Sequence, residues 1–276
     1  MDMVRLAIDG KEVRVPKGST ILQAAKAAGV DIPTLCYHEE LDVKAMCRVC
    51  VVEVAGARTL QAACSQPATD GMVVLTNSPA VRKARRMNVE LLLSNHPQDC
   101  LNCVRNQRCD LQALADKLGI RQQRFASRTK TPLPKDTSSA ALVRDPEKCI
   151  LCRRCVEVCH QVQKVAALYP INRGFDTLIA PTGGVDLNAV ACVQCGQCAL
   201  VCPVGAIYEQ DHTERVWAAL ADPEKHVVVQ TAPAIRVSIG EEFGLEPGQV
   251  STGQLVAALR RLGFDKVFDT DFTADL

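Results

Sequence analysis

The sequence is short of aromatic side chains, of net charge and of long apolar runs. Aromatic residues make up only 4% of its 276 positions. Hydrophobic residues as a class reach 47%, so the chain can form several small cores, but these cores contain few large rings. Bound metal centres brace such domains, because the bonds to the ligands replace part of the missing apolar burial.

The lack of charge imbalance and of apolar segments excludes further classes of protein. A net charge of +1 gives no strong attraction to nucleic acid or to an anionic membrane. The first ten residues contain charged side chains where a secretion signal needs an apolar run, and no stretch approaches the roughly 20 apolar residues of a membrane span. We therefore expect a soluble, cytoplasmic protein, in a compartment where thiols stay reduced and bind metals.

What the sequence does contain is fifteen cysteines in four groups. They are Cys36, Cys47, Cys50 and Cys64; Cys100, Cys103 and Cys109; Cys149, Cys152, Cys155 and Cys159; and Cys192, Cys195, Cys198 and Cys202. Their odd number and tight spacing disfavour a disulfide framework. With His96 they make sixteen ligands, which is enough for four iron–sulfur clusters with four ligands each. We therefore predict a chain that passes single electrons from cluster to cluster.

The last two groups share the pattern Cys-x2-Cys-x2-Cys-x3-Cys, which is typical of bacterial ferredoxins with two clusters. Three cysteines at this spacing wrap one 4Fe-4S cube, and the fourth reaches the other cube. One predicted cluster is bound by Cys149, Cys152, Cys155 and Cys202, and the other by Cys159, Cys192, Cys195 and Cys198. Zinc sites fit these runs poorly, because a zinc ion usually needs only two Cys-x-x-Cys pairs. His160 stands where the second run has Pro203, which is a departure from the ferredoxin pattern.

The first two groups are less specific. The spacing Cys36-x10-Cys47-x2-Cys50-x13-Cys64 differs from that of plant ferredoxins, but it keeps three thiols on one loop and a fourth on a returning strand. We predict a 2Fe-2S cluster here, with a zinc site of four cysteines as the alternative. Around His96, the residues alone leave two readings open, a 4Fe-4S cluster or a zinc site with three cysteines and one histidine.

The pattern of apolar residues and turn signals predicts a multidomain α+β protein. Apolar positions alternate on both sides of Asp9-Gly10, which predicts a hairpin over residues 1–15. Ser19 or Thr20 can cap a helix that ends at Gly29, and short strands follow at 49–54, 58–63 and 72–75. This order is typical of a β-grasp domain. Helices are predicted from Pro79 to about Asn95 and over 110–118.

The predicted organisation has five parts. These are a 2Fe-2S β-grasp domain at 1–78, a histidine- and cysteine-ligated 4Fe-4S domain at 79–120, a linker at 121–144, a ferredoxin-like domain with two 4Fe-4S clusters at 145–210, and a partial α/β module at 211–276. In the last part, strands near 227–230 and 266–268 enclose two helices that end at Gly244 and Gly263. This β-α-α-β order is the beginning of an α/β domain.

The cysteine spacings, together with His96-Pro-Gln-Asp-Cys-Leu-Asn-Cys, resemble the N-terminal half of the large iron–sulfur subunit of respiratory complex I and related subunits of NAD-linked hydrogenases and formate dehydrogenases. In the tail, Thr231-Ala-Pro-Ala-Ile-Arg and Leu262-Gly-Phe-Asp-Lys-Val-Phe-Asp resemble the first part of the iron–iron hydrogenase catalytic domain. The resemblance implies that His96, Cys100, Cys103 and Cys109 hold a 4Fe-4S cluster.

The family resemblance also implies a function. The chain is similar to the cluster-bearing subunit of NAD-linked, electron-bifurcating hydrogenases. The partners of such a subunit would be a flavin- and NAD(H)-binding diaphorase subunit, a small 2Fe-2S subunit, a hydrogenase catalytic subunit and ferredoxin. Because no G-x-G-x-x-G loop is present, we expect flavin and NAD(H) to bind to the partners. The alternatives are a relay subunit of a formate dehydrogenase or complex I-like assembly, and a zinc-stapled scaffold.

The resemblance has one large departure. The hydrogen-converting cluster of iron–iron hydrogenases needs four more cysteines, and none follows Cys202. We therefore expect no catalytic residue in this chain, which would be either a piece of a longer protein or a natural short subunit.

Overall fold

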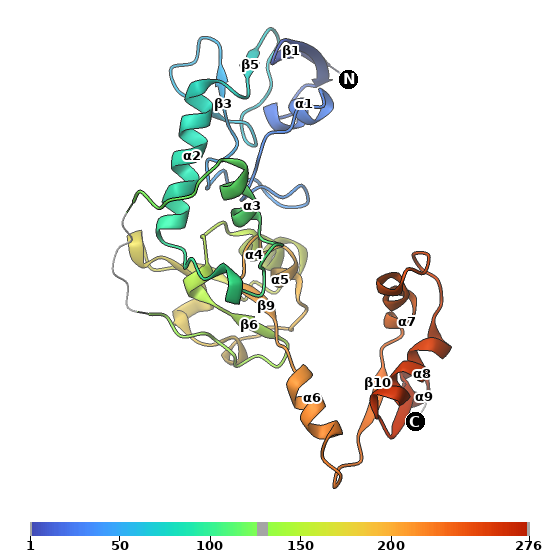
Figure 1. The fold of residues 1–276 in the computed structure, drawn as a ribbon. Helices are drawn as coiled ribbons and strands as arrows, with labels where there is room; N and C mark the ends of the chain where they lie inside the picture. Colours follow the sequence, from blue (N-terminus) through green and yellow to red (C-terminus); the bar gives the residue numbers. More distant parts are fainter. Residues whose placement is uncertain (1, 126–131, 275–276) are drawn as a thin grey trace. The chain divides into compact units, whose positions relative to one another are not determined.

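The computed structural model describes residues 2–125 and 132–274 (Figure 1). The chain divides into two compact units, Met1–Gln210 and Asp211–Leu276. Within the described ranges, no helix has both the length and the apolar character that crossing a membrane requires.

A five-stranded sheet forms the first part of the first unit. Its strands are β1 (Met3–Ile8), β2 (Lys11–Pro16), β3 (Val51–Val54), β4 (Gln61–Ala62) and β5 (Val73–Leu75), in the order β2-β1-β5-β3-β4. β1 and β2 pair in the antiparallel direction around Asp9-Gly10, and β1 pairs with β5 in the parallel direction. The hairpin predicted from the alternation of apolar residues is therefore confirmed.

The helix α1 (Ile21–Ala27) lies close to β1 in Figure 1 and begins at a capping box. The hydroxyl oxygen of Thr20 accepts a hydrogen bond from the backbone N–H of Gln23 at 3.2 Å, and the side-chain oxygen of Gln23 accepts one from the N–H of Thr20 at 2.8 Å. These bonds satisfy two of the donors that a helix N-terminus leaves open. The helix buries Ile21, Ala24 and Ala25 in one core with the sheet.

The helix α2 (Pro79–Ser94) packs on β3 and leads into the second part. It starts where the sequence predicts, with the Ser78 hydroxyl accepting from the N–H of Val81 at 3.3 Å. The buried guanidinium of Arg85 donates to the carbonyl of Val51 at 2.9 Å, which joins the helix to the sheet. The shorter helix α3 (Asp110–Lys117) packs against α2.

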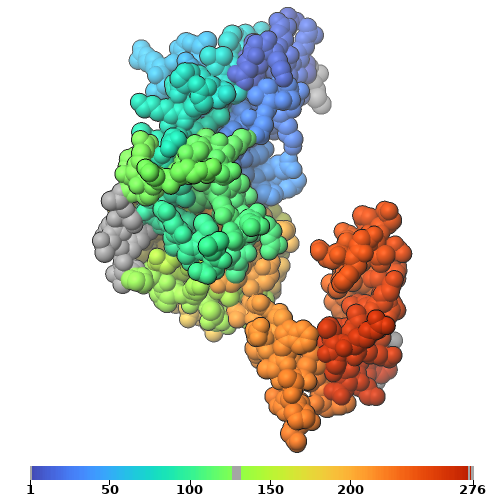
Figure 2. Space-filling view, in the orientation of Figure 1, coloured from blue at the N-terminus to red at the C-terminus, as the bar shows by residue number. Residues whose placement is uncertain are grey.

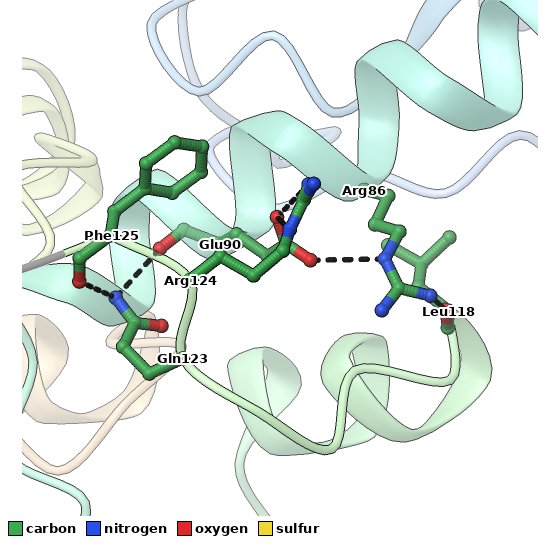
Figure 3. A network of polar contacts seen from close by, with 6 residues as sticks. All are labelled: Arg86, Glu90, Leu118, Gln123, Arg124 and Phe125. Carbon is green, nitrogen blue, oxygen red and sulfur yellow. Dashed lines mark hydrogen bonds and ion pairs between the residues drawn. The ribbon is translucent and has the colours of Figure 1, made fainter.

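Figure 3 shows how α2 holds the segment that follows α3. The fully buried Glu90 carboxylate accepts from Arg86 Nε at 2.9 Å and from Arg124 Nε at 2.8 Å. The Gln123 side chain donates to the backbone carbonyls of Glu90 and Phe125. Hydrogen bonding from Arg124 is the main cause that keeps the pKa of Glu90 below its ordinary value. A charged Glu90 therefore anchors residues 123–125 to the helix.

The last third of the first unit consists of very short elements. They are β6 (Leu142–Arg144), β7 (Tyr169–Ile171), β8 (Leu178–Ala180), β9 (Ile207–Glu209), α4 (Arg154–Glu157), the π-helical turn Val158–Val162, α5 (Gln197–Leu200), and the 3-10 turns Pro146–Lys148, Gly174–Asp176, Thr182–Gly184 and Leu187–Ala189. A further 3-10 turn, Cys100–Asn102, lies between α2 and α3. β6 pairs with β9 and β7 with β8, in each case antiparallel.

One apolar core joins the three parts of the first unit. It contains Leu35 and Val49 from the first part, Val89 and Leu111 from the second, and residues such as Ile179 from the third. The corresponding blue-to-cyan, green and yellow segments pack against one another on the surface in Figure 2. The predicted domains at 1–78, 79–120 and 145–210 thus share apolar contacts.

Part of the predicted linker at 121–144 differs from the prediction. Residues 142–144 form β6, and Asp136, Ser139 and Leu142 are buried. The polar residues of this segment suggested a surface strap, but an interior position is favourable because partners inside the fold satisfy them. Residues 126–131 of the linker lie outside the described residues.

The second unit contains two parallel strands, β10 (Val228–Thr231) and β11 (Lys266–Asp269), which pair directly. Its remaining elements are α6 (Thr213–Leu220), α7 (Ile235–Ser238), the 3-10 turn Ile239–Phe243, α8 (Thr252–Leu262) and α9 (Thr270–Ala274). The helices α7 and α8 lie between the strands in sequence, so the predicted β-α-α-β order is confirmed.

Candidate metal centres

The first four cysteines come together between α1 and β4. Cys36, Cys50 and Cys64 are buried, and the backbone N–H of Cys47 donates to the Cys36 sulfur at 3.5 Å. The loop that carries Cys47 and Cys50 turns through Ala45 and Arg48, whose φ angles are 51° and 55°. Such left-handed positions turn backbone N–H groups to one side, which suits them to sulfur atoms.

The electrostatics also show that these four thiols are neighbours. A hydrogen bond from the Cys47 thiol lowers the pKa of Cys36 to about 6, and one from Cys64 lowers the pKa of Cys50 to about 7. In turn these bonds, with burial, raise the pKa of Cys47 and Cys64. The two pairs also interact across the site, because Cys36 affects both Cys50 and Cys64. The fold thus gathers all four residues that the spacing selected.

The His96 group lies in the loop between α2 and α3. The Nδ1 atom of His96 is buried and has no hydrogen-bond partner. Burial, and then the charge of Lys148, lower the pKa of His96, so the imidazole is neutral and has a ring nitrogen available to a metal. Burial also raises the pKa of Cys109.

Gly205 marks a close approach between this loop and the last part of the unit. A Cβ atom at this position would lie 2.8 Å from the Cys103 sulfur and 3.6 Å from the Lys148 side chain. Lys148, which is also the neighbour of His96, thus lies near the same glycine as Cys103. Arg105 fixes the same contact, because it donates to the carbonyl of Cys202 at 2.6 Å. Cys100 is exposed.

The two remaining groups line two separate cavities, and the residues are divided between them as the ferredoxin spacing predicts. One cavity is lined by Cys149, Cys152, Cys155 and Cys202 together with apolar residues that include Ile179, Val204 and Ile207. The other is lined by Cys159, Cys192, Cys195 and Cys198 together with Leu142, Leu168 and Leu187. In each cavity the fourth cysteine comes from the opposite run, which is the crossed arrangement inferred from the sequence.

The two runs use the same backbone turn. In the first run, Leu151 and Arg153 have φ angles of 56° and 65°, and in the second, Gln194 and Gly196 have 54° and 76°. These residues flank the second cysteine of each run. In the first run the turn directs the N–H of Leu151 to the Cys149 sulfur at 3.4 Å. A left-handed conformation at a non-glycine residue is unfavourable, so its repetition indicates a constraint from the site.

Burial dominates the chemistry of these thiols. It raises the pKa of Cys152 and of Cys198 to about 12, and it raises that of Cys155 as well. Protonated thiols in apolar cavities become metal ligands by releasing their protons when a metal binds. Among the residues that the structure describes, no three His, Cys, Asp or Glu side chains are grouped in the arrangement of a single-ion site.

Several cations near the cysteine groups are held by specific contacts. Lys148 is only 7% exposed, and its Nζ atom lies 3.7 Å from Oδ2 of Asp99. Arg154 donates to the carbonyl of Tyr37 at 2.8 Å and pairs with Asp110. Sequence reasoning missed Arg144, which lines the cavity of Cys149, because it lies in the segment predicted as a linker. The short apolar run Leu142-Val143 before Asp145-Pro146 could have indicated a strand there.

Comparison with known families matches nearly the whole chain. Four family profiles match: "2Fe-2S iron-sulfur cluster binding domain" at residues 1–79, "NADH-ubiquinone oxidoreductase-G iron-sulfur binding region" at 85–124, "4Fe-4S dicluster domain" at 148–206, and "Iron only hydrogenase large subunit, C-terminal domain" at 225–276.

Among solved structures, a chain of the NAD+-reducing NiFe-hydrogenase in the H2-reduced state is 33% identical, with a TM-score of 0.70, and the match covers 75% of this chain and 87% of that one. This chain belongs to the iron–sulfur subunits of NAD(P)-linked hydrogenases and complex I-like assemblies. The predicted family is thereby confirmed. Because its members are subunits of larger complexes, membership implies that other subunits exist.

Two further relatives extend over the full chain. The NADP-reducing hydrogenase subunit HndD of Solidesulfovibrio fructosivorans is 51% identical over 100% of this chain and 48% of its own length. Iron hydrogenase 1 of Clostridium pasteurianum is 37% identical over 99% of this chain and 48% of its own length. This iron–sulfur subunit therefore spans about half the length of these curated relatives.

Proposed function

We propose that this chain is an electron relay in a hydrogenase complex. It would hold one 2Fe-2S cluster on Cys36, Cys47, Cys50 and Cys64, and three 4Fe-4S clusters on His96, Cys100, Cys103 and Cys109; on Cys149, Cys152, Cys155 and Cys202; and on Cys159, Cys192, Cys195 and Cys198. The clusters, when bound, accept and release single electrons. The crossed division of eight cysteines between two cavities is the observation that carries this proposal.

The protein residues have three tasks in this relay. The thiols and His96 hold iron, and the unpartnered Nδ1 of His96 supports its inclusion. Apolar side chains such as Ile179 and Leu187 line the cavities and limit the access of water. Backbone N–H groups such as that of Leu151 point at sulfur atoms and stabilise their negative charge.

The proposed partners are a flavin- and NAD(P)H-binding subunit, a small 2Fe-2S subunit, ferredoxin and a hydrogen-activating site in another chain or domain. The support comes from the relatives, which are described as an NADP-reducing hydrogenase subunit and an NAD+-reducing NiFe-hydrogenase. The hydrogenase profile over residues 225–276 favours hydrogen over formate or quinone as the terminal reactant. Electron bifurcation and a cytoplasmic location remain part of this proposal.

The test is chemical analysis of the full chain purified without oxygen. We expect about 14 iron atoms per chain, a similar amount of acid-labile sulfide, and EPR signals of both cluster types. About four zinc atoms and no sulfide would instead identify a zinc-stapled scaffold. In the complex isolated with its partners, hydrogen or NAD(P)H should reduce the EPR-active clusters. Purification of the complex with a formate-oxidising subunit would overturn the hydrogenase assignment alone.

A further inference from the structure

A buried ion pair lies beside one of the two cysteine-lined cavities. Arg144 Nη2 is 3.4 Å from Asp136 Oδ2, and the two side chains are only 8% and 2% exposed. Their backbones also exchange two N–H to C=O hydrogen bonds of 2.9 Å. The Asp136 carboxylate additionally accepts from the N–H of Leu187 at 2.9 Å and from Ser138. This pair has a fixed position and orientation, because both partners are anchored on several sides.

Of the two partners in this ion pair, only the cation lines the cavity. Arg144 lines the cavity of Cys149, Cys152, Cys155 and Cys202, whereas Asp136 does not. Arg144 Nη1 donates to the carbonyl of Ile179 at 3.1 Å, and Ile179 also lines this cavity. The Nε atom of Arg144 is buried without a hydrogen-bond partner. An unsatisfied N–H at the wall of a thiol-lined cavity is costly unless a ligand there accepts from it.

Two other charged residues line the same cavity. Asp145 is buried and pairs with Lys135 at 3.4 Å, so its negative charge is partly offset. Arg153 belongs to the turn between two cysteines, and its Nε atom also has no partner. The wall therefore carries two guanidinium groups and one carboxylate, whose Oδ1 atom is buried without a hydrogen-bond partner, and Arg144 is the cation that comes from outside the ferredoxin runs.

We propose that Arg144, held by Asp136, raises the reduction potential of the cluster that Cys149, Cys152, Cys155 and Cys202 bind. This inference rests on the proposed cluster assignment. Reduction adds one electron, supplied by a neighbouring cluster, and moves no proton or ligand. A fixed positive charge in a medium of low dielectric constant stabilises the added negative charge, and hydrogen bonds and local charge are the means by which a protein tunes such clusters.

The test uses the full chain with its clusters and the substitutions Arg144→Gln, Arg144→Lys and Asp136→Asn. Mediated redox titrations are followed by EPR, and the signal of this cluster is assigned with Cys202→Ser. We expect Arg144→Gln to lower the potential by about 59 mV or more, which is a tenfold change in the ratio of reduced to oxidised cluster for one electron. Arg144→Lys should keep a potential close to that of the unchanged chain.

Asp136→Asn should shift the reduction potential in the direction opposite to Arg144→Gln. The amide oxygen can still accept from the N–H of Leu187, and the amide NH2 can donate to the hydroxyl oxygen of Ser138, but the negative charge behind Arg144 is lost, so the potential should rise. A merely structural role of the pair cannot produce shifts of opposite sign. Glu90→Gln is the matched control, because Glu90 is also a buried carboxylate between arginines and lines neither cysteine cavity. It should leave this potential unchanged.

Shifts in the same direction for Arg144→Gln and Asp136→Asn, or no shift with all clusters retained, would overturn the inference. If the Arg144→Gln chain does not assemble the cluster, the potentials of Asp136→Asn and Arg144→Lys test the inference instead. A lower potential in Asp136→Asn would then refute the inference. An unchanged chain without iron and sulfide would instead refute the proposed function, so the two failures are distinguishable.

Discussion

Residues 3–75 contain a five-stranded sheet and a capped helix that enclose an apolar core of their own. Residues 142–209 contain two pairs of three-residue strands, and their apolar residues belong to a core shared with the rest of the unit. Isolated two-stranded pieces are marginally stable in water. The difference teaches that the first region has an apolar core of its own, whereas the second has none, so we expect its stability to depend on the clusters proposed for its eight cysteines.

Removal of the clusters gives the sharpest test of this difference. After treatment with chelator and oxidant, the amides of β6 and β9 should exchange hydrogen at least about 100-fold faster, because the ligand bonds that close the two cavities are gone. The amides of β1 and β2 should keep most of their protection. Hydrogen exchange followed by mass spectrometry measures both regions in one sample. Equal loss of protection in the two regions would contradict the comparison.

Substitution of single cysteines should show a smaller effect that depends on burial. Cys155→Ser places a hydroxyl in the shared core and should remove the whole cluster, about four iron atoms, because this buried position is poorly accessible to water or an added thiol. Cys195→Ser changes an exposed position, where water or an added thiol can take over. Iron content and thermal unfolding of the two variants provide the measurement. The same iron loss in both would mean that burial does not decide retention.

A variant of His96 tests the part of the chain between the two regions compared, residues 3–75 and 142–209. His96→Ala should remove or convert one cluster and leave the other three, because it removes the imidazole whose buried Nδ1 atom has no hydrogen-bond partner. EPR and iron analysis report the change, and His96→Cys should restore four ligands. Unchanged spectra and iron content in His96→Ala would exclude His96 as a ligand.

The smallest expected effect is on the first region alone. Thr20→Ala removes the capping box of α1 and should lower the free energy of unfolding of the sheet domain by about 1 kcal/mol. Thr20→Ser keeps the oxygen and serves as the control. Denaturant unfolding of the cluster-free chain isolates this domain. A stabilised Thr20→Ala variant would show that the cap is not used.

Several elements follow from local sequence. The Asp9-Gly10 turn, the caps at Thr20 and Ser78, and the apolar spacing along α8 each act within a few residues. The cysteine spacing is equally local, since the same turn of a few residues surrounds Cys152 and Cys195. For this reason the ligand groups and the division of eight cysteines between two cavities could be read before any fold was known.

Other features depend on distant partners. The burial of Asp136 requires Arg144 and Leu187, the second of which lies 51 residues away, and the close approach at Gly205 requires the loop of Cys103. Local patterns carry no information on such pairs. For this reason the sequence predicted that residues 132–144 belong to a linker.

The sequence by itself determined which cysteines line each of the two cavities, because the turns that carry them are short and their geometry depends on spacing along the chain. Only the tertiary structure decided which charges lie at the cavity walls and which helix and sheet share a core, because electrostatic and apolar contacts act through space between segments that are far apart in sequence.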